Sequence, residues 1–375
     1  MRIALTGGGT GGHLFPILAV VQEIKKLIDS NVFQIPPGEG TGVEFIFLGP
    51  ETIGEEALAK EGITHKKIMA GKLRRYASLQ NIFDIFKIPC GLAQSLWHLF
   101  FFMPNVVFSK GGYGSVPVVL AAWIFRIPVI IHESDSVPGL ANKFCAVFSR
   151  RVAISFSEAG KYFPEKKTAL TGNPVRNALY DGSAEQAKQT FGLSGMKSVI
   201  LILGGSQGAQ VINDLIFTSL LLLTKRCDLI HQTGRTNFEN VKQLIGNDIP
   251  PEYHILPFLD EQQLTQAYAA ADLVITRGGA TTIAEIAALG KPSILIPLPD
   301  AAADHQLKNA TEFAHTGGTV IMEQANLTPH LFQSEIFSLL DNPDLLKKMG
   351  ENAKKFSHPD AAQKIAQEIM NIAKY

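Results

Sequence analysis

The residues ADLVITRGGATTIAEIAALGKPSILIPLP, numbers 271–299, contain the pattern that decides the fold. A short apolar run at 272–276 predicts a β-strand, and the glycines that follow at 277–279 predict a tight turn. A helix is expected at about 280–289, ended by glycine and proline, with a second strand at 293–297. Strand, turn, helix and strand in this order form one βαβ unit, the building block of a parallel sheet.

Two interpretations of this unit are open. A helix that begins directly after a glycine turn presents free backbone N–H groups and a positive dipole end, which suit a phosphate. Glu285, inside the helix, can accept hydrogen bonds from two neighbouring hydroxyls, as a ribose offers. Thr282 and Glu285 also match the T-x-x-E capping box, which needs no ligand. The unit therefore predicts either a nucleotide site or a well-capped helix.

The alternation of strands and helices extends outward from this unit and starts twice along the chain. Each start is a strand followed by a glycine loop and an amphipathic helix, first at 2–12 and again at 198–208. The predicted strands are 2–6, 43–48, 106–109, 128–132 and 151–154 in the first half, and 198–203, 229–231, 254–256, 273–276 and 293–297 in the second. This alternation predicts parallel sheets.

The repeated start predicts a doubly wound α/β fold with two similar domains that face each other across a cleft. The boundary is expected near 171–174, which gives a first domain at 1–172 and a second at 173–356. Residues 357–375 include an amphipathic helix at about 361–373 that packs on one of the domains, with the first as our candidate.

The composition agrees with two domains and excludes several classes of protein. The chain has 375 residues, 46% of them hydrophobic, and equal numbers of basic and acidic residues at 34 each. Nucleic acid is therefore not an expected partner. Three dispersed cysteines, no histidine pair at helical spacing and no Asp-x-Asp motif argue against disulfides and against a metal cofactor. The sequence also lacks the pattern of a signal peptide and of a membrane-spanning helix.

Three glycine loops follow predicted strands, at 7–12, 111–115 and 204–208. The first matches G-x-G-x-x-G, but the second strand ends near Glu51, much later than the acidic residue of a dinucleotide site should appear. This spacing argues against NAD. His13 also stands where a Walker A motif has its lysine.

Several polar residues lie at expected loop ends, each with an alternative role. His13 is a candidate general base, made neutral by the positive end of its helix, or it simply caps that helix. Glu133 and Asp135 follow a strand and could hold sugar hydroxyls or cap the next helix. Arg176 could clamp a diphosphate or be a surface arginine, and the polar run 304–309 suits the hydroxyls of a sugar.

Residues 66–103 combine basic side chains with a surplus of large apolar ones, including Trp97 and the phenylalanines at 100–102. Basic residues beside exposed apolar ones can dock on an anionic membrane surface. Much of the surplus is also compatible with an ordinary helix core. The segment therefore predicts either a membrane-contacting surface or a buried helix.

With these residues assembled, the chain closely resembles the MurG family of peptidoglycan N-acetylglucosaminyltransferases over essentially its whole length. The matching motifs are GGGTGGHLFPILAV, SKGGYGSVPVVLAA, HESDSVPGLANK, TGNPVR, LGGSQGAQVIN, TRGGATTIAEIAALGKPSILIPLP and DHQLKNA, in this order. The resemblance implies a GT-B fold with two Rossmann-like domains. It also implies an inverting, metal-free transfer from UDP-N-acetylglucosamine to the 4-hydroxyl of lipid I, at the cytoplasmic face of the bacterial membrane.

The resemblance also implies roles for individual residues. His13 is the candidate base, Leu259 meets the uracil through its backbone, and Glu285 takes the ribose hydroxyls. The expected donor-binding residues are Thr10, Gly11, Gly12, Asp135, Arg176, Ser206, Leu259, Ala280, Thr281, Thr282, Ile283, Ala284, Glu285, His305, Gln306 and Asn309, and the expected acceptor-binding residues are Gly111, Gly112 and Tyr113.

Three features depart from the family pattern. Asp135 replaces an asparagine, His305 replaces a glutamine of some members, and the segment 260–272 resembles an unusually long loop. Related activities on the same fold are a diacylglycerol glycosyltransferase and a UDP-N-acetylglucosamine 2-epimerase. A nucleotide-sugar sensor without catalysis and an NAD oxidoreductase are the alternatives from other classes.

Overall fold

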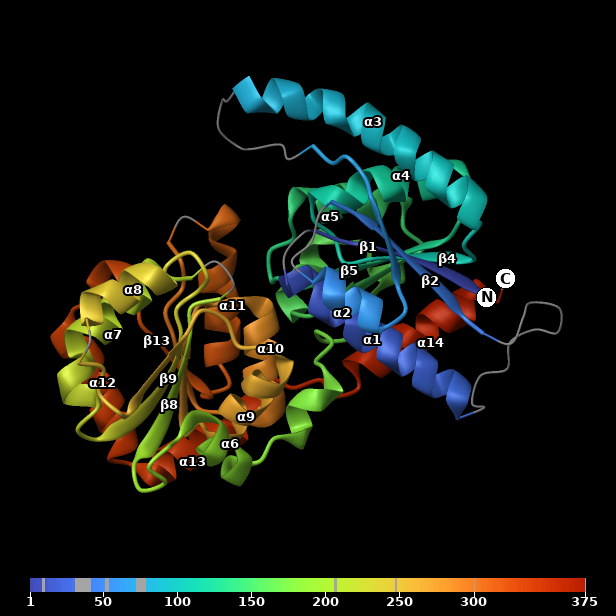
Figure 1. Cartoon of the computed structure of the whole chain (residues 1–375). Coiled ribbons are helices and arrows are strands. Elements are labelled where there is room, and N and C mark those ends of the chain that lie inside the picture. The colour runs from blue at the N-terminus through green and yellow to red at the C-terminus, as the bar shows by residue number, and fades with distance from the viewer. Residues whose placement is uncertain are drawn as a thin grey trace. The chain divides into compact units, whose positions relative to one another are not determined.

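The computed structural model consists of two compact units, Met1–Arg176 with His358–Tyr375, and Asn177–Ser357 (Figure 1). It describes residues 1–8, 11–30, 42–50, 54–71, 79–205, 208–246, 248–299 and 301–374. For residues 79–86 and 302 it describes the backbone alone. The first unit extends to Arg176, whereas the sequence predicts that the first domain ends at residue 172.

The first unit contains a seven-stranded parallel sheet with the order β3-β2-β1-β4-β5-β6-β7. Its strands are β1 (Arg2–Thr6), β2 (Glu44–Gly49), β3 (Thr64–Lys67), β4 (Val106–Ser109), β5 (Val129–Glu133), β6 (Arg151–Ile154) and β7 (Thr168–Leu170). Its helices are α1 (Gly11–Asp29), α2 (Glu55–Lys60), α3 (Leu79–Phe102), α4 (Val116–Ile124), α5 (Leu140–Phe148) and α14 (Ala361–Ala373).

Both faces of this sheet are buried. Side chains alternate between the two faces along each strand, so neighbouring residues of one strand pack in different cores. Ile3 and Leu5 of β1 pack in one apolar core with α1 and α14. Ala4, between them in sequence, packs in a second core with α4 and α5. The C-terminal helix α14 therefore belongs to the first unit, where it completes the layer next to α1 (Figure 1).

The second unit contains a six-stranded parallel sheet with the order β10-β9-β8-β11-β12-β13. Its strands are β8 (Ser198–Leu203), β9 (Cys227–Gln232), β10 (Tyr253–Leu256), β11 (Leu273–Thr276), β12 (Ser293–Leu295) and β13 (Thr319–Ile321). Its helices are α6 (Ala184–Phe191), α7 (Gln210–Leu223), α8 (Phe238–Ile245), α9 (Glu261–Ala270), α10 (Ala280–Leu289), α11 (His305–Ala314), α12 (Pro329–Leu340) and α13 (Pro343–Lys354).

Both sheets have the doubly wound strand order, in which the chain reverses direction across the sheet after its third strand. The switch point lies between β1 and β4 in the first unit and between β8 and β11 in the second. Ligands of such folds bind outside the carboxyl ends of the strands at this point. The loops that follow these four strands are therefore where a site is expected.

The three strands that the sequence analysis missed, β3, β7 and β13, each lie at an edge of a sheet. They are short, and β3 has the sequence THKK with no apolar residue to mark a buried face. Edge strands pack against one neighbour only, so the hydrophobic signal that marks central strands is weak. The predicted two-domain α/β architecture with parallel sheets is confirmed.

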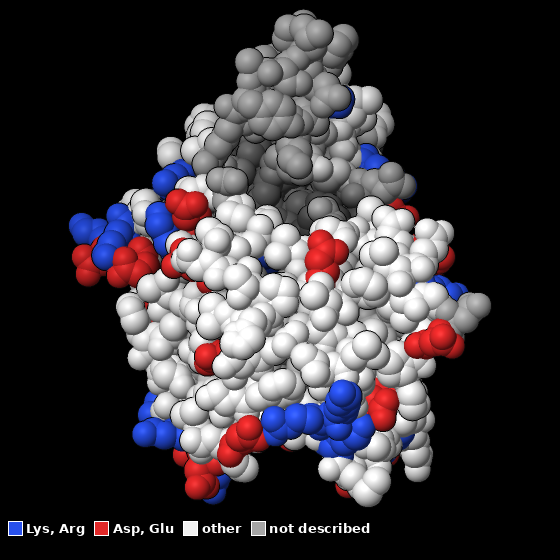
Figure 2. All heavy atoms as spheres, turned by 90° about the vertical axis from the view of Figure 1, so that its left-hand side faces the viewer, with Lys and Arg blue, Asp and Glu red and all other residues white. Residues whose placement is uncertain are grey.

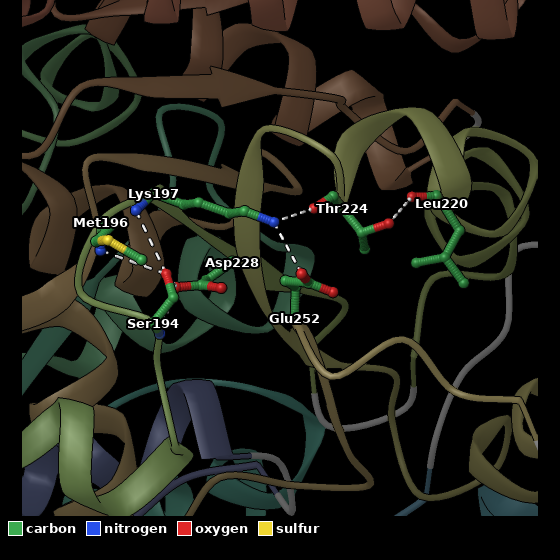
Figure 3. Close-up of polar contacts among 7 residues, drawn as sticks. All are labelled: Ser194, Met196, Lys197, Leu220, Thr224, Asp228 and Glu252. Carbon is green, nitrogen blue, oxygen red and sulfur yellow. Dashed lines mark hydrogen bonds and ion pairs between the residues drawn. The ribbon is translucent and has the colours of Figure 1, made fainter.

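The opposite, amino-terminal edge of the second sheet is held by a polar cluster (Figure 3). Lys197, just before β8, donates to the Thr224 carbonyl at 2.7 Å and pairs with Glu252 at 2.8 Å. Asp228 accepts from the backbone N–H and the hydroxyl of Ser194 at 2.9 and 2.7 Å. This cluster connects the starts of β8, β9 and β10 to the end of α7. It lies at the edge of the sheet opposite the switch-point loops and has a structural role.

Candidate functional site

The glycine loops of the first unit pack against each other at its switch point. The loop after β1 includes Gly7 and Gly8, and the loop after β4 includes Gly112 and Gly114. A Cβ added to Gly112 would lie 3.1 Å from Gly8 Cα, and one added to Gly114 would lie 2.8 Å from the Gly7 carbonyl oxygen. The loops approach this closely because glycine has no side chain.

His13 lies in the first turn of α1, against both loops. Its Nδ1 lies 3.2 Å from the Lys110 carbonyl oxygen, so Nδ1 carries the proton and donates to that carbonyl. The other ring nitrogen, Nε2, is 3.0 Å from a Cβ built on Gly8 and 3.5 Å from one built on Gly112. The imidazole therefore presents a proton-accepting nitrogen to the glycine loops.

The pKa of His13 is lowered, chiefly by burial and then by the nearby Lys110 charge, while Asp135 opposes the shift. The sequence analysis expected a neutral imidazole from the helix dipole, and burial is the larger cause here. The alternative of a helix cap is wrong, because the ring bonds to the end of β4 and not to its own helix.

The predicted acceptor residues form the loop that follows β4. Gly111 and Gly112 both have positive φ angles, 81° and 83°, which favour glycine. A Cβ on Gly111 would lie 2.4 Å from Oδ1 of Asn142, so a side chain there would collide with α5. Tyr113 then begins a short 3-10 helix. Gly11 and Gly12 are the first residues of α1, and Thr10 lies outside the described residues.

Glu133 has a structural role that the sequence analysis left open. Its side chain is buried and accepts hydrogen bonds from the Asp135 N–H at 2.9 Å and from Asn142 Nδ2 at 2.8 Å. It also accepts from the N–H of Gly139, which precedes α5. Burial, with the Asp135 charge, raises the pKa of Glu133 to about 7. Glu133 therefore closes the loop before α5, while Asp135 is only partly buried on that loop.

Arg176 is not the surface arginine of the alternative interpretation. It is buried, and its guanidinium carbon lies 4.2 Å from the centre of the Phe15 ring. Phe15 is in the first turns of α1, two residues after His13. Stacking of a guanidinium on an aromatic face stabilises both groups, and it fixes the end of the first unit against the helix that carries His13.

The sequence analysis missed Lys110, which directly precedes the second glycine loop. Lysine is rarely fully buried, and a basic residue beside a glycine loop suggests an exposed position. Its side chain is nevertheless buried and bonded to His132, Ser134 and Asn173. Burial lowers the pKa of Lys110 to about 7. No signal in the sequence alone separates it from a surface lysine.

The corresponding loops of the second unit follow β8 and β11. The turn Arg277, Gly278 and Gly279 leads into α10, which begins at Ala280. The N-cap residue of the helix is Gly279, which makes no side-chain cap hydrogen bond. Thr282 is the third residue of the helix and not its cap, so the capping-box interpretation is wrong. Ser206, in the loop after β8, lies outside the described residues.

Glu285 lies one turn further along α10, beyond Thr281, Thr282, Ile283 and Ala284. Its side chain is mostly buried, and Oε2 accepts a hydrogen bond from the hydroxyl of Tyr268 at 3.0 Å. Tyr268 is fully buried in α9. The carboxylate is therefore held in one orientation by a partner that sequence analysis did not identify.

The polar run 304–309 forms the start of α11, which lies against the turn after β11. Asn309 is buried and donates to the Gly278 carbonyl at 3.2 Å, and a Cβ on Gly278 would lie 2.3 Å from the Gln306 carbonyl oxygen. The Gln306 side chain accepts from the Leu298 N–H at 3.0 Å. His305 is the first residue of α11.

The residues before α11 have unusual backbone conformations. Ala303 and Asp304 have φ angles of 59° and 54°, in the left-handed region that residues other than glycine rarely adopt. Such strain persists only where the surrounding structure holds it, and it is found frequently at ligand sites. The structure thus brings the start of α11 against the turn that leads into α10.

Leu259 lies beside the same edge of the second sheet. Its backbone N–H donates to Oε1 of Gln232, at the end of β9, at 2.9 Å. The next residue, Asp260, caps α9 together with Gln263. Leu259 is thus fixed between the end of one strand and the start of one helix.

Comparison with known proteins identifies relatives over the whole chain. Residues 3–154 match the glycosyltransferase family 28 N-terminal domain, and residues 199–365 match the C-terminal domain of that family. The UDP-N-acetylglucosamine--N-acetylmuramyl-(pentapeptide) pyrophosphoryl-undecaprenol N-acetylglucosamine transferases of Bacillus cytotoxicus and Halalkalibacterium halodurans are each 35% identical, with 100% of both chains covered.

Solved structures agree with these relatives. The chain resembles the crystal structure of MurG from Acinetobacter baumannii with a TM-score of 0.71 and 27% identity, over 99% of each chain. It also resembles UDP-GlcNAc 2-epimerase from Neisseria meningitidis bound to UDP-GlcNAc, with a TM-score of 0.67 and 15% identity over 99% of this chain and 100% of the other. At that identity the second likeness concerns the fold alone.

Proposed function

The chain belongs to the MurG family of glycosyltransferases, and we propose that the two sets of switch-point loops hold the two substrates of its reaction. It is an N-acetylglucosaminyltransferase of peptidoglycan synthesis, which moves N-acetylglucosamine from UDP-N-acetylglucosamine to the 4-hydroxyl of lipid I and so produces lipid II. The observation that carries this function is the 35% identity to such transferases over the full length of both chains.

The donor is proposed to bind the second unit. The N–H groups at the start of α10 and the positive end of its dipole suit the diphosphate. The carboxylate of Glu285 takes the ribose hydroxyls, and the start of α11, with His305, Gln306 and Asn309, contacts the sugar. Because the Leu259 N–H already bonds to Gln232, the Leu259 carbonyl oxygen is the backbone group for the uracil.

The acceptor is proposed to bind the first unit, at the loop of Gly111, Gly112 and Tyr113. The 4-hydroxyl oxygen forms a bond to the anomeric carbon of the donor sugar while the bond from that carbon to UDP breaks. The hydroxyl proton passes to Nε2 of His13, and UDP leaves with the electron pair. The lowered pKa of His13 supports this role, since it keeps the imidazole able to accept a proton near neutral pH.

The departing diphosphate requires electrostatic stabilisation, which preorganised donors supply without reorganising during the reaction. The first-turn N–H groups of α10 have this character. Gly11, Gly12 and Arg176 of the first unit are further candidates for the donor phosphates, and Asp135 for the donor sugar. Thr10 and Ser206 keep their proposed donor roles, although both lie outside the described residues.

We expect the full chain to release UDP when it is incubated with UDP-N-acetylglucosamine, a lipid I analogue and EDTA, and not when the acceptor is omitted. A coupled assay measures the released UDP, and mass spectrometry identifies the lipid product. Conversion of UDP-N-acetylglucosamine to its 2-epimer without the acceptor would indicate epimerase chemistry, and transfer to diacylglycerol would indicate a lipid glycosyltransferase. No release in several detergents would contradict the assignment.

We further propose that the chain works as a peripheral protein at the cytoplasmic face of the membrane, where its lipid-linked acceptor is anchored. No helix among the described residues is long and apolar enough to cross a bilayer. The first unit instead exposes a surface that we call the aromatic patch, formed by Trp97, Phe100, Phe101 and Met103 of α3 and its end, Trp123, Ile124 and Phe125 at the end of α4, and Leu140, Phe144 and Val147 of α5.

The aromatic patch is continuous, because ring contacts connect its three helices. Phe100 and Phe125 have ring centres 6.3 Å apart, and Phe148 lies 5.3 Å from Trp123 and 5.2 Å from Phe144. The exposed cations Arg126, Lys143 and Arg150 lie beside it in sequence. Aromatic side chains flanked by cations suit the interface of an anionic bilayer.

The structure divides the segment that suggested this surface. Leu92, Leu96 and Leu99 of α3 pack in the core with α4, whereas Trp97 and Phe101 point outward. One face of α3 is thus buried in the core, and the opposite face is exposed and available for the proposed membrane contact. Lys72, Arg74 and Arg75 lie outside the described residues, as do the side chains of 79–86.

We expect the double variant Trp97→Gln and Phe101→Gln to bind vesicles of phosphatidylglycerol and phosphatidylcholine at least about tenfold more weakly than the natural chain, because two large apolar side chains no longer enter the interface. Vesicle sedimentation at rising salt measures this loss. Binding of the natural chain should also fall with salt, since anionic lipid attracts the flanking cations.

The second unit offers a matched control. Leu221 and Leu222 of α7 are exposed, Leu221 to 74%, and Figure 2 shows few charged side chains over much of the face on the α7 side of the molecule. The double variant Leu221→Gln and Leu222→Gln should bind vesicles normally. If this control loses binding and the Trp97, Phe101 variant does not, the aromatic patch is not the membrane surface.

A further inference from the structure

The buried side chain of Lys110 connects four segments of the first unit. Its Nζ is 2.6 Å from Nδ1 of His132 and 2.9 Å from Oδ1 of Asn173, and it also bonds to Oγ of Ser134. Only 1% of the residue is exposed. An ammonium has three N–H donors, and each has an acceptor here, so the buried charge is fully hydrogen-bonded.

The neighbouring hydrogen bonds determine which atoms donate. Nε2 of His132 is 3.0 Å from the Gly172 carbonyl oxygen, and a carbonyl only accepts, so Nε2 carries the proton. His132 is buried, and burial with the Lys110 charge holds its pKa well below the ordinary value. Its Nδ1 is therefore an acceptor, which requires Lys110 to donate.

The backbone of the same residue orients the proposed base. The Lys110 carbonyl accepts the Nδ1–H of His13 at 3.2 Å, and the Lys110 N–H donates to the Thr6 carbonyl at 2.9 Å. The side chain and the backbone of one residue thus link the end of β4 to β5, to residues 172–173 and to the start of α1. A shift of Lys110 would move the imidazole.

We propose that Lys110 is a positioning residue for the transfer, whose buried ammonium fixes the end of β4 so that its carbonyl holds His13 with Nδ1 protonated and Nε2 directed at the acceptor. This inference rests on the proposed role of His13 as the base. A lysine acting only on fold stability would leave the tautomer of His13 unchanged.

The charge of Lys110 has a second effect on His13. Two ionisable groups act on the imidazole from the packed segments, Lys110 after β4 and Asp135 after β5, and Glu133 at the end of β5 acts on Lys110. Lys110 lowers the pKa of His13 and Asp135 raises it. Removing the lysine charge takes away one of the two causes that lower the pKa of His13, so this pKa should move up.

The test uses the full chain with the variants Lys110→Met, Lys110→Gln and Lys197→Met. Methionine removes the charge and all three donors, whereas glutamine keeps two N–H donors without the charge. Lys197 is a partly buried lysine that donates to Thr224 and pairs with Glu252 in the second unit, so its variant is a control for the chemical change (Figure 3).

Long-range 1H–15N spectra of the labelled chain report the tautomer and the pKa of His13. The His13 signal is identified as the one that is absent from the spectrum of His13→Gln. In Lys110→Met we expect some Nε2–H tautomer, a His13 titration moved to higher pH, and turnover at pH 7 about 10- to 100-fold lower. Lys110→Gln should show the same upward titration with more of the original tautomer kept. Lys197→Met should leave the His13 signal and turnover unchanged.

The outcomes separate this inference from the proposed function. An unchanged His13 tautomer and titration in both folded Lys110 variants would overturn the positioning role, whatever their turnover. Near-normal turnover of His13→Gln would instead remove His13 as the base, while the spectra still decide whether Lys110 orients it. If Lys110→Met does not fold, the Lys110→Gln spectra decide alone.

Discussion

Replacement of His13 by glutamine is expected to lower turnover by about 10² to 10⁴-fold, the usual contribution of a positioned general base. Glutamine keeps a side chain of similar polarity that can still donate to the Lys110 carbonyl, but it cannot take the acceptor proton. The affinity for UDP-N-acetylglucosamine, measured by calorimetry, should stay near normal, because His13 acts on the acceptor. Turnover within a few-fold of the natural chain would assign the proton transfer to another group.

The pH dependence of turnover gives an independent measure of the same residue. The base must be neutral, so the rate falls on the acid side as His13 is protonated. Because burial and Lys110 lower the pKa of His13, this fall should lie below pH 6.5, the ordinary value for histidine. The fall should be absent from the residual activity of His13→Gln. A fall centred above pH 6.5 would contradict the lowered pKa.

The glycine loops of the candidate site could be predicted from sequence because their signals are local. Gly7, Gly8, Gly111 and Gly112 follow strands, and tight strand-to-helix turns need glycine whatever the rest of the chain does. Parallel strands end at a common edge, so loops distant in sequence, such as those after β1 and β4, lie close together. The bounds of α10 and α14 were also predicted, since glycine, proline and helical spacing mark them.

The partners of the site residues could not be predicted, because they depend on tertiary packing. Lys110 bonds to Asn173, 63 residues away, and nothing near either residue signals this contact. Tyr268 lies in the segment 260–272, which looked like a long loop but forms α9. The capping box at Thr282 failed for a related reason: the N-cap of the helix is Gly279, three residues before Thr282. A short motif does not give the register of a helix.

The largest expected effect on donor binding is that of Glu285→Ala. If the carboxylate holds the ribose, the variant loses charge-assisted hydrogen bonds worth about 1–3 kcal/mol, so the dissociation constant of UDP-N-acetylglucosamine should rise about 5- to 150-fold. Calorimetry measures this rise. The variant also leaves the buried Tyr268 hydroxyl without its carboxylate partner, so its melting temperature should fall too. Binding and stability must therefore be separated.

Tyr268→Phe makes that separation, because it removes the hydroxyl that donates to Glu285 and keeps the carboxylate itself. This variant should have a lower melting temperature than the natural chain. It should weaken donor binding less than Glu285→Ala does. A 2′-deoxyribose donor analogue then isolates the ribose contact. The natural chain should bind this analogue more weakly than the normal donor. Glu285→Ala should bind the analogue and the normal donor with equal affinity, because it has no carboxylate to accept from the 2′-hydroxyl. If the analogue instead binds more weakly than the normal donor by the same factor in Glu285→Ala and in the natural chain, Glu285 only packs against α9 and another group holds the ribose.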